Sequence, residues 1–173
     1  MRVLTSFIFV AFLHTLPSGS FAQQVCQSGL AMSAPDGRYV VQTDTSQVKD
    51  TRTGLIWQRC SSGQTWSGNA CTGSARLMTW QTVLTLAGTA GSSNGFAWRV
   101  PSFKELTTLA ELGCWSPAIN VTFFPTTPEA GHWTSTSLAS NPSQAWFVMF
   151  SLAGEYYDAK TNFHYVRFVR SSQ

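Results

Sequence analysis

Four cysteines, Cys26, Cys60, Cys71 and Cys114, constrain this 173-residue chain more strongly than any other feature of its sequence. An even number of cysteines in an exported domain is typical of a disulfide framework, and four cysteines permit three different pairings. A zinc site is disfavoured, because no two cysteines form a C-x-x-C pair and no histidine lies next to a cysteine.

The N-terminal segment has the order of features of an export signal. Arg2 precedes an apolar stretch over residues 3–13, a helix-breaking segment follows at residues 17–20, and Ser20 and Ala22 are small residues suited to a signal-peptidase site. We expect residues 1–22 to be a signal peptide that is removed after Ala22, and residues 23–173 to form a single domain. The alternative interpretation is a short buried N-terminal helix.

The spacing of the cysteines favours one of the three pairings. Cys60 and Cys71 enclose a polar, glycine-containing loop that a local bridge can close. We therefore predict a Cys60–Cys71 disulfide, which leaves Cys26–Cys114 as a long-range bridge that stabilises more in the loop-closure model.

Composition excludes several classes of protein. Charged residues make up 11% of the chain, against roughly 25% in ordinary soluble domains, and the formal net charge is +3. Such a small charge does not indicate a nucleic-acid binder. An apolar content of 43% argues against disorder. No run of about 20 apolar residues occurs beyond the N-terminus, so we expect no membrane span.

The helical signals cluster in the middle of the chain. Apolar residues at helical spacing predict an amphipathic helix over residues 77–87, ended by the segment 88–95. Ser102 and Glu105 form a capping box, which predicts a second helix that runs to a stop at Gly113.

Strand-like segments lie before and after these helices. They comprise residues 39–43, 55–59, 132–136, 145–150 and 165–170, and residues 48–54 have the composition of a turn. Because the helices are grouped and do not alternate with strands, the sequence favours an α+β fold over a doubly wound parallel sheet.

Seven ordered blocks of this chain resemble one known family. The first is D-x-x-T-G-L-x-W-Q-R-C at residues 50–60, and the second is G-Q-x-W-x-G-x-x-C-x-G at residues 63–73. The others are W-R-V-P-S-x-K-E-L at 98–106, P-A-I-N with a later F-P at 117–125, H-W-T-S at 132–135, A-W-x-V-x-F with a glycine at 145–154, and V-R-x-V-R at 166–170. The chain is similar to the DUF1566 family, also named for the C-terminal domain of the Legionella collagen-like adhesin, although Val100 replaces the expected leucine.

This resemblance implies a fold akin to those of C-type lectins and formylglycine-generating enzymes. Such a fold has two helices, a small twisted antiparallel sheet, long loops and termini joined by strand pairing. Residues 39–43 and 166–170 are both strand-like, so we expect these two segments to pair. The two disulfides predicted above are compatible with this fold.

Most of the motif residues are expected to have structural roles. We predict that four motif tryptophans, Trp57, Trp98, Trp133 and Trp146, are buried in the core, since indole rings anchor small cores. The Arg99 guanidinium is expected to bind backbone carbonyls or an acid, either Glu105 or Asp50. The structural set comprises Asp50, Gly54, Trp57, Trp98, Arg99, Glu105, Trp133 and Trp146.

Aromatic and basic residues in loops are better candidates for ligand contact. Trp66 lies in the predicted disulfide loop, Trp115 follows Cys114, and the rest lie in or near the turn between the last two strands. Aromatic rings can stack on a sugar, and a lysine can attract a sulfate or carboxylate. The predicted ligand-binding set is Trp66, Trp115, Tyr156, Tyr157, Lys160 and His164; ordinary surface packing is the alternative.

We therefore expect an exported, non-catalytic binding or adhesion module that recognises glycans, extracellular matrix, polyanionic surface ligands or a surface protein partner. A structural or assembly subunit of a surface or periplasmic complex is the alternative. No nucleophile–base geometry follows from the sequence, so enzyme activity is disfavoured. No clustered acids suggest calcium, and we expect no metal, cofactor or nucleic acid. The expected location is periplasmic, cell-surface or extracellular.

Overall fold

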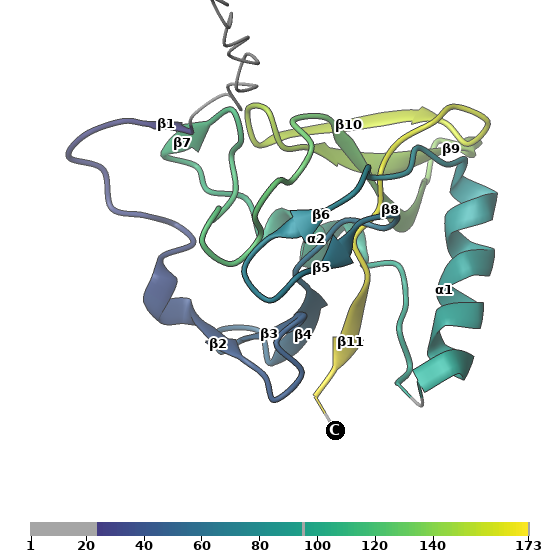
Figure 1. The fold of residues 1–173 in the computed structure, drawn as a ribbon. Coiled ribbons are helices and arrows are strands. Elements are labelled where there is room, and N and C mark those ends of the chain that lie inside the picture. Colours follow the sequence, from purple (N-terminus) through teal and green to yellow (C-terminus); the bar gives the residue numbers. More distant parts are fainter. Residues whose placement is uncertain (1–23, 95, 173) are drawn as a thin grey trace, which may run out of the picture.

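The computed structural model describes residues 24–94 and 96–172 of the chain (Figure 1). The predicted signal peptide, residues 1–22, lies outside these residues. The described part contains both helices and strands, and every sheet is antiparallel and small, as an α+β fold requires.

A four-stranded sheet has the order β11-β4-β3-β2. Its strands are β2 (Tyr39–Val41), β3 (Gln47–Asp50), β4 (Leu55–Gln58) and β11 (Val169–Ser171). Two expectations were wrong. The turn predicted at residues 48–54 is shorter, because residues 48–50 belong to β3, which pairs with β2 on one side and β4 on the other. The predicted pairing between residues 39–43 and 166–170 does not occur, because β2 and β11 are the opposite edges of this sheet.

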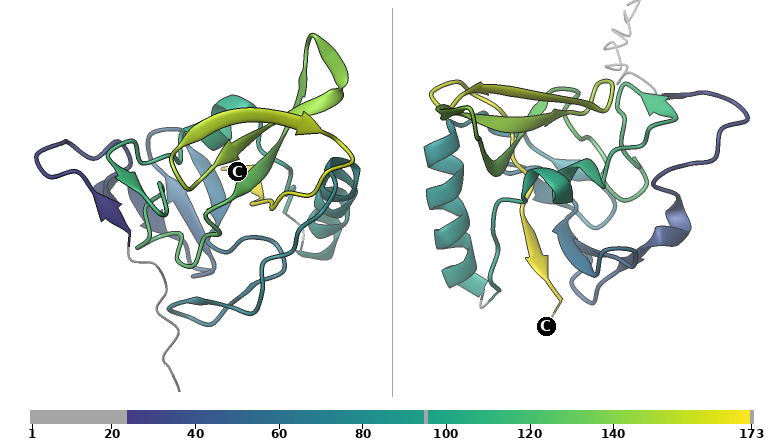
Figure 2. Two further views of the ribbon diagram at one scale, coloured as in Figure 1. Left: turned by 90° about the horizontal axis from the view of Figure 1, so that it is seen from above. Right: turned by 180° about the vertical axis from the view of Figure 1, so that it is seen from behind.

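A three-stranded sheet lies across one end of the molecule (Figure 2). Its order is β10-β9-β8, with β8 at Gly131–Leu138, β9 at Asn141–Met149 and β10 at Gly154–Ala159. Strands β8 and β9 extend the two predicted segments at residues 132–136 and 145–150. The segment predicted as a strand at residues 165–170 is mostly irregular, and only its end enters β11.

Both predicted disulfides are confirmed, and each staples a two-stranded ribbon. Cys60–Cys71 closes the hairpin of β5 (Thr65–Trp66) and β6 (Cys71–Thr72). Cys26–Cys114 joins β1 (Val25–Cys26) to β7 (Cys114–Trp115). The expected joining of the termini is therefore wrong, because the first strand pairs with β7 and the last with β4.

The helices differ from prediction in length. Helix α1 spans Trp80–Asn94, later than the predicted 77–87, because Met78 forms a β-bridge with His164 and the helix continues through Gly88. A short 3-10 turn, η1, covers Asp36–Arg38. Helix α1 and the N-terminal segment lie at opposite sides of the molecule (Figures 1 and 2).

The second helix, α2 (Phe103–Thr107), begins with the predicted capping box. Ser102 Oγ accepts from the Glu105 backbone N–H, and the Glu105 carboxylate accepts from that of Ser102. The helix does not reach Gly113, because Ala110 leaves it to form a β-bridge with Ile119.

Two adjoining clusters make up the core. The first packs Trp57 and residues of the four-stranded sheet against the segment 106–124. The second packs Trp98 and Trp133 between α1 and the three-stranded sheet. These three indoles are buried as predicted. Trp146 was predicted in the core but is only half-buried; its ring packs against Phe103 at the start of α2 and Tyr157 of β10.

Two ion pairs fix the motif loops. Arg99 donates two hydrogen bonds, of 2.6 and 2.7 Å, to the Glu105 carboxylate, which confirms one of its two predicted acid partners. Asp50 instead binds Arg38, through contacts of 2.7 and 2.5 Å, and accepts from Thr53 Oγ1 at 2.6 Å. Gly54 completes this turn at φ +74°, a left-handed conformation that favours glycine.

Candidate functional site

The predicted ligand-binding residues lie in three separate places. Trp66 is in the disulfide-closed hairpin β5–β6, and Trp115 is in β7. The remaining four, Tyr156, Tyr157, Lys160 and His164, lie on or just after β10. The structure thus brings four of the six together.

The two tyrosines lie on a strand and not in the turn expected from the sequence. Because successive side chains of a strand point to opposite faces, Tyr156 and Tyr157 flank different sides of the sheet. Tyr156 stacks on Phe147, with ring centroids 5.8 Å apart, and Tyr157 meets Trp146 edge-on at 5.6 Å. Both phenols are about half exposed, and neither tyrosine lines either of the two pockets described below.

Lys160 and His164 are held by neighbouring side chains. The Lys160 ammonium lies 3.9 Å from the centroid of the Trp80 ring and donates to Ser137 Oγ at 2.7 Å. The His164 ring stacks on Phe147 at 4.1 Å, and its Nε2 lies 2.9 Å from Asp158 Oδ2. Both residues therefore have a structural role, whether or not a ligand is bound.

One of the predicted ligand-binding residues, Trp66, lines a pocket of about 480 Å³ beside the hairpin β5–β6. We call it the Trp66 pocket. It lies between the hairpin, the β3–β4 pair, helix α1 and the segment that enters β11. Its lining consists of Asp44, Ser46, Gln47, Gln58, Cys60, Ser61, Ser62, Gly63, Gln64, Thr65, Trp66, Leu86, Trp98 and Phe168.

The Trp66 ring is fixed in this pocket. The Arg59 guanidinium carbon lies 3.9 Å from the ring centroid and covers one face, and the indole Nε1 donates to Thr45 Oγ1 at 3.0 Å. The Cys60–Cys71 disulfide closes the hairpin that carries the ring. A planar ligand can therefore stack only on the opposite face, and the ring loses little freedom when it does so.

We assign Arg59 the role of holding the Trp66 ring in place, and not that of contacting the ligand. Its three nitrogens donate to the backbone carbonyls of Thr45, Thr122 and Phe123. The guanidinium is largely buried, and this desolvation lowers its pKa from the ordinary value. These three bonds and the contact with the ring make Arg59 a clamp beneath Trp66.

The polar wall of the pocket offers one acid and several amides. Burial alone would raise the pKa of Asp44, but hydrogen bonds from Ser46 and Gln47 hold it below its ordinary value. Gln47 is itself fixed, because its amide oxygen accepts from Arg170. The Gln58 side chain makes no hydrogen bond to another described residue, so both its donor and its acceptor are available.

Trp98, which also lines the pocket, carries a donor that is itself buried. Its side chain is 4% exposed, and its Nε1–H has no hydrogen-bond partner among the residues that the structure describes. Buried indole N–H groups usually have a partner. Sequence reasoning placed Trp98 only in the core and missed Asp44, Gln47 and Gln58, because these residues meet only through the pairing of β3 with β4.

A buried serine–histidine pair borders the pocket, whose lining includes Ser61. Ser61 Oγ is 3.1 Å from His132 Nε2, and the buried Arg167 guanidinium lies 3.4 Å from the same oxygen. Burial and the positive charge of Arg167 lower the pKa of His132 from 6.5 to about 3. Because Ser61 is 1% exposed and His132 0%, this arrangement is a hydrogen-bond network of the core.

A larger groove of about 780 Å³ lies on the other side of the hairpin. Pro117, Val121, Pro125 and Pro128 give it a mainly apolar lining, and Glu129 is its one ionisable residue. It contains none of the predicted ligand residues. Among the described residues, no group of three acids, cysteines or histidines is placed to hold a metal ion.

These features define a small, disulfide-bonded α+β domain with a pocket of aromatic and amide side chains. The family model of the Lcl C-terminal domain matches residues 46–170, which is more than half of the chain, so the chain belongs to this family. A search of curated proteins finds no match. In the part of the chain that the structure describes, no helix has the length and apolar character needed to cross a membrane.

Proposed function

We propose that this chain is an exported, non-catalytic adhesion module that binds neutral glycans in the Trp66 pocket. Membership of the Lcl C-terminal domain family supports an adhesin-like role. The two disulfides are compatible with export to the periplasm, cell surface or medium. A C-type-lectin-like arrangement stays a prediction.

One observation carries this proposal: a fixed indole ring, the free amide of Gln58 and the carboxylate of Asp44 line one concave site. A pyranose has an apolar face of C–H groups and a rim of hydroxyls. Trp66 offers the aromatic surface for the first, while Asp44 and Gln58 offer acceptors and donors for the second.

The charges of the pocket favour neutral sugars over sulfated ones. Its lining contains Asp44 and no lysine, arginine or histidine. A sulfate or carboxylate would meet this ionised acid, and the guanidinium whose charge acts on Asp44, that of Arg170, already donates to Gln47. The net charge of +3 over the whole chain gives little long-range attraction for polyanions. The sequence suggested glycans, matrix or polyanions as ligands. Of these three classes, we propose uncharged glycans as the ligands of the pocket.

A glycan array that carries neutral and sulfated oligosaccharides tests the proposal, run at two salt concentrations. We expect retention of neutral glycans with little change between the two salts, because no counterions are released on binding. Trp66→Ala removes a stacking surface worth about 1.5–3 kcal/mol, so affinity should fall about 10- to 100-fold. Asp44→Asn tests the hydroxyl contacts.

Trp115→Ala is the matched control, since Trp115 is an exposed indole in a different ribbon. It should leave glycan retention unchanged. Retention of sulfated glycans alone, or equal loss in the two tryptophan variants, would contradict the proposal. Circular dichroism in the near ultraviolet checks that both variants keep the native packing.

A further inference from the structure

The side chain of Arg170, in the last strand β11, reaches across β4 to the polar wall of the Trp66 pocket. Arg170 pairs in register with Ile56 of β4, and Gln58, two residues further along β4, pairs with Gln47 of β3. Residues two apart on a strand share a face, so Arg170 and the two glutamines lie on one face of the four-stranded sheet. Both glutamines line the pocket.

Hydrogen bonds lead from Arg170 through Gln47 to Asp44. Arg170 Nε and Nη2 donate to Gln47 Oε1 at 3.2 and 2.9 Å, and Gln47 Nε2 donates to Asp44 Oδ2 at 2.7 Å. The other carboxylate oxygen, Oδ1, accepts from the backbone N–H and the hydroxyl of Ser46 at 3.0 and 2.7 Å. The orientation of the Asp44 carboxylate is therefore set at both of its oxygens.

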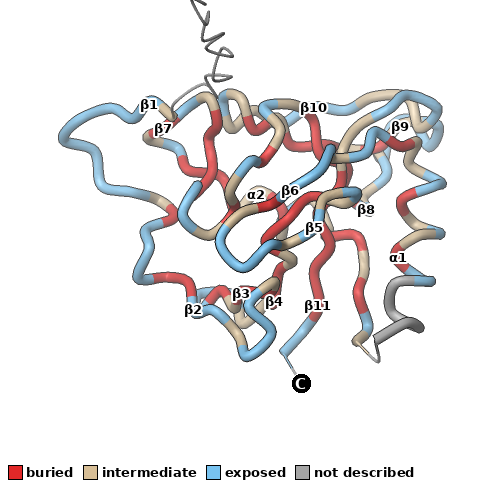
Figure 3. The backbone as a smooth tube through the Cα atoms, in the orientation of Figure 1, coloured by how far each residue is buried: buried red, intermediate tan, exposed pale blue. Residues whose placement is uncertain are grey.

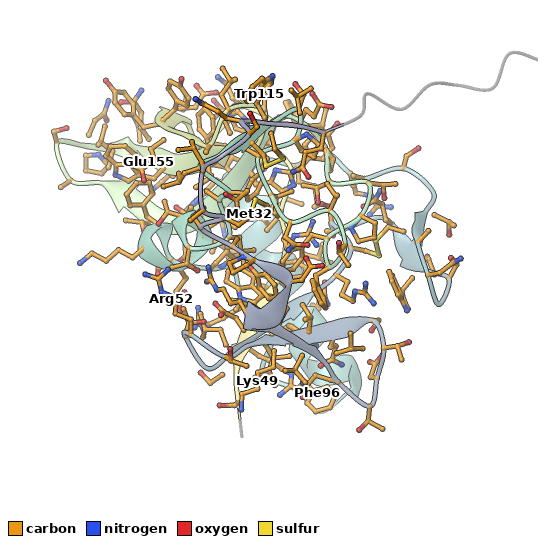
Figure 4. The ribbon with its side chains drawn as sticks, turned by 90° about the vertical axis from the view of Figure 1, so that its left-hand side faces the viewer. Met32, Lys49, Arg52, Phe96, Trp115 and Glu155 are labelled. Carbon is orange, nitrogen blue, oxygen red and sulfur yellow. A yellow bond between two sulfur atoms is a disulfide. The ribbon has the colours of Figure 1, made fainter. Side chains whose placement is uncertain are left out.

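The Arg170 guanidinium is itself fixed in place. Its carbon lies 4.2 Å from the centroid of the Phe96 ring and 5.5 Å from that of a Trp98 ring, and the residue is 8% exposed. Figure 3 shows β11 buried up to its last residue, Ser171. In Figure 4, Phe96 lies at the same end of the molecule as Lys49 of β3. An arginine stacked on rings and bonded along its edge has little freedom left to lose when a ligand binds.

Arg170 also acts on Asp44 through its charge. Burial alone would raise the pKa of Asp44, but hydrogen bonds from Ser46 and Gln47 and the positive charge of Arg170 hold it below the ordinary value. Removal of the Arg170 charge should therefore raise this pKa, because a group that favours the ionised carboxylate is lost.

The other charged groups on the elements around Asp44 are directed elsewhere. Arg59, which follows β4, donates through Nη1 to the carbonyl of the residue after Asp44. Lys49 lies on the same face of β3 but does not line the pocket, and Arg99, next to Trp98, is bound to Glu105. Helix α1 and the segment 61–72, which contains the hairpin β5–β6, have no charged residue in their sequences.

We infer that Arg170 is a positioning residue of the Trp66 pocket, which acts through Gln47 to hold the Asp44 carboxylate as a fixed, ionised acceptor for a sugar hydroxyl. This inference rests on the proposed function of the pocket. In the described part of the chain, Asp44 Oδ2 accepts from Gln47 alone, so it keeps a lone pair for a ligand. A hydroxyl that donates to an ionised acceptor makes a stronger bond than one that donates to a neutral acceptor.

Calorimetric titration of the exported protein with a panel of neutral hexose disaccharides, between about pH 3 and 8, tests this role. The unaltered protein should lose affinity as Asp44 takes up a proton. Arg170→Met keeps an apolar stem against the rings but removes the charge, so affinity at neutral pH should fall about three- to tenfold, and the acid loss should begin at a higher pH. A merely structural role would lower affinity without moving the pH profile.

Arg170→Lys restores the charge without the paired donors, so its pH profile should lie between those of Arg170→Met and the unaltered protein. Arg52→Met is the matched control, because it removes one positive charge from the exposed turn at the other end of β3. It should bind like the unaltered protein. Near-ultraviolet circular dichroism checks the packing of all three variants.

The carbon-13 signal of the Asp44 carboxyl group gives a second measurement, without any sugar. It should titrate at higher pH in Arg170→Met than in the unaltered protein. An unmoved titration and pH profile, or an equal change in Arg52→Met, would overturn the role of Arg170 and leave the sugar site standing. A shifted carboxyl titration in a protein that binds no sugar of the panel would instead overturn the proposed function, and this inference with it.

Discussion

Replacement of Asp50 by asparagine should destabilise the fold more than any other single change of comparable size. The Asp50 carboxylate is fully buried and binds Arg38 Nε and Nη2, which are themselves buried. It also accepts from Thr53 Oγ1 and from the Arg52 backbone N–H. Asp50→Asn keeps the shape but removes the charge that compensates Arg38.

The magnitude follows from the burial of both partners. Breaking a buried ion pair by removing one partner costs about 3–5 kcal/mol, because the remaining charge is left in a poorly solvating site. For a chain of this size, that corresponds to a fall in melting temperature of roughly 6–20 °C. Urea unfolding of Asp50→Asn, followed by intrinsic tryptophan fluorescence, measures the loss directly.

The double variant Arg38→Met, Asp50→Asn supplies the control. It removes the uncompensated charge, so it should be less destabilised than the sum of the two single variants. A cost below about 1 kcal/mol for Asp50→Asn, or simple additivity in this cycle, would refute the reasoning, because either result means that the pair contributes as an exposed pair would.

The same pair gives a pH dependence with a definite sign. Burial alone would raise the pKa of Asp50, but the hydrogen bonds from Arg38 and Thr53 hold it below the ordinary value. The pair therefore stabilises the fold above the unfolded-state pKa of about 3.9, and this stabilisation is lost as the pH falls toward the folded pKa. Asp50→Asn should lack this component of acid unfolding.

Three further predictions concern other parts of the chain. The folded pKa of His132, about 3, lies below the unfolded 6.5, so stability falls by about 2 kcal/mol between pH 7 and 5; His132→Gln should abolish that fall, and an unchanged pH profile would contradict it. Replacing Cys60 and Cys71 by serine should cost about 3 kcal/mol in denaturant unfolding and weaken glycan retention; retention at full strength would show that the bridge does not hold Trp66. Glu111→Gln should cost about 2–3 kcal/mol and speed hydrogen exchange at residues 33–34, where unaltered exchange would show that the carboxylate does not hold the segment between β1 and η1.

Interactions between residues close in sequence could be predicted from the sequence. The capping box at Ser102 and Glu105 starts α2 as predicted, and Arg99 binds the acid six residues further along. Disulfide pairing was also predictable, because the short polar loop between Cys60 and Cys71 favoured their bridge. These features depend on residues close in sequence or on a small number of pairings.

The pairing of strands that are far apart in sequence could not be predicted from the sequence. The edge strands β2 and β11 looked alike as isolated β-branched segments, but β4 and β3 lie between them because each pairs with its neighbour in register. The predicted helix at 77–87 began too early, since no local signal shows that Met78 would pair with His164 across the fold.

The candidate site was predicted only in part. Trp66 was chosen as an aromatic residue in a loop, and the structure places it in a pocket. Asp44 and Gln58 come from segments fourteen residues apart and approach only when β3 pairs with β4. Tyr156 and Tyr157 are exposed as expected, but strand geometry sends them to opposite faces and leaves them without a shared cavity.

The indole N–H signals of the seven tryptophans offer the most direct measurement of where a sugar binds. Nitrogen-15-labelled protein would be titrated with a panel of neutral hexose disaccharides up to about 10 mM. Sugar binding in the pocket predicts saturable shifts of the Trp66 and Trp98 indole signals, with the Trp115 signal unmoved. Shifts confined to Trp115, or no shift with any sugar of the panel, would contradict the assignment of the pocket.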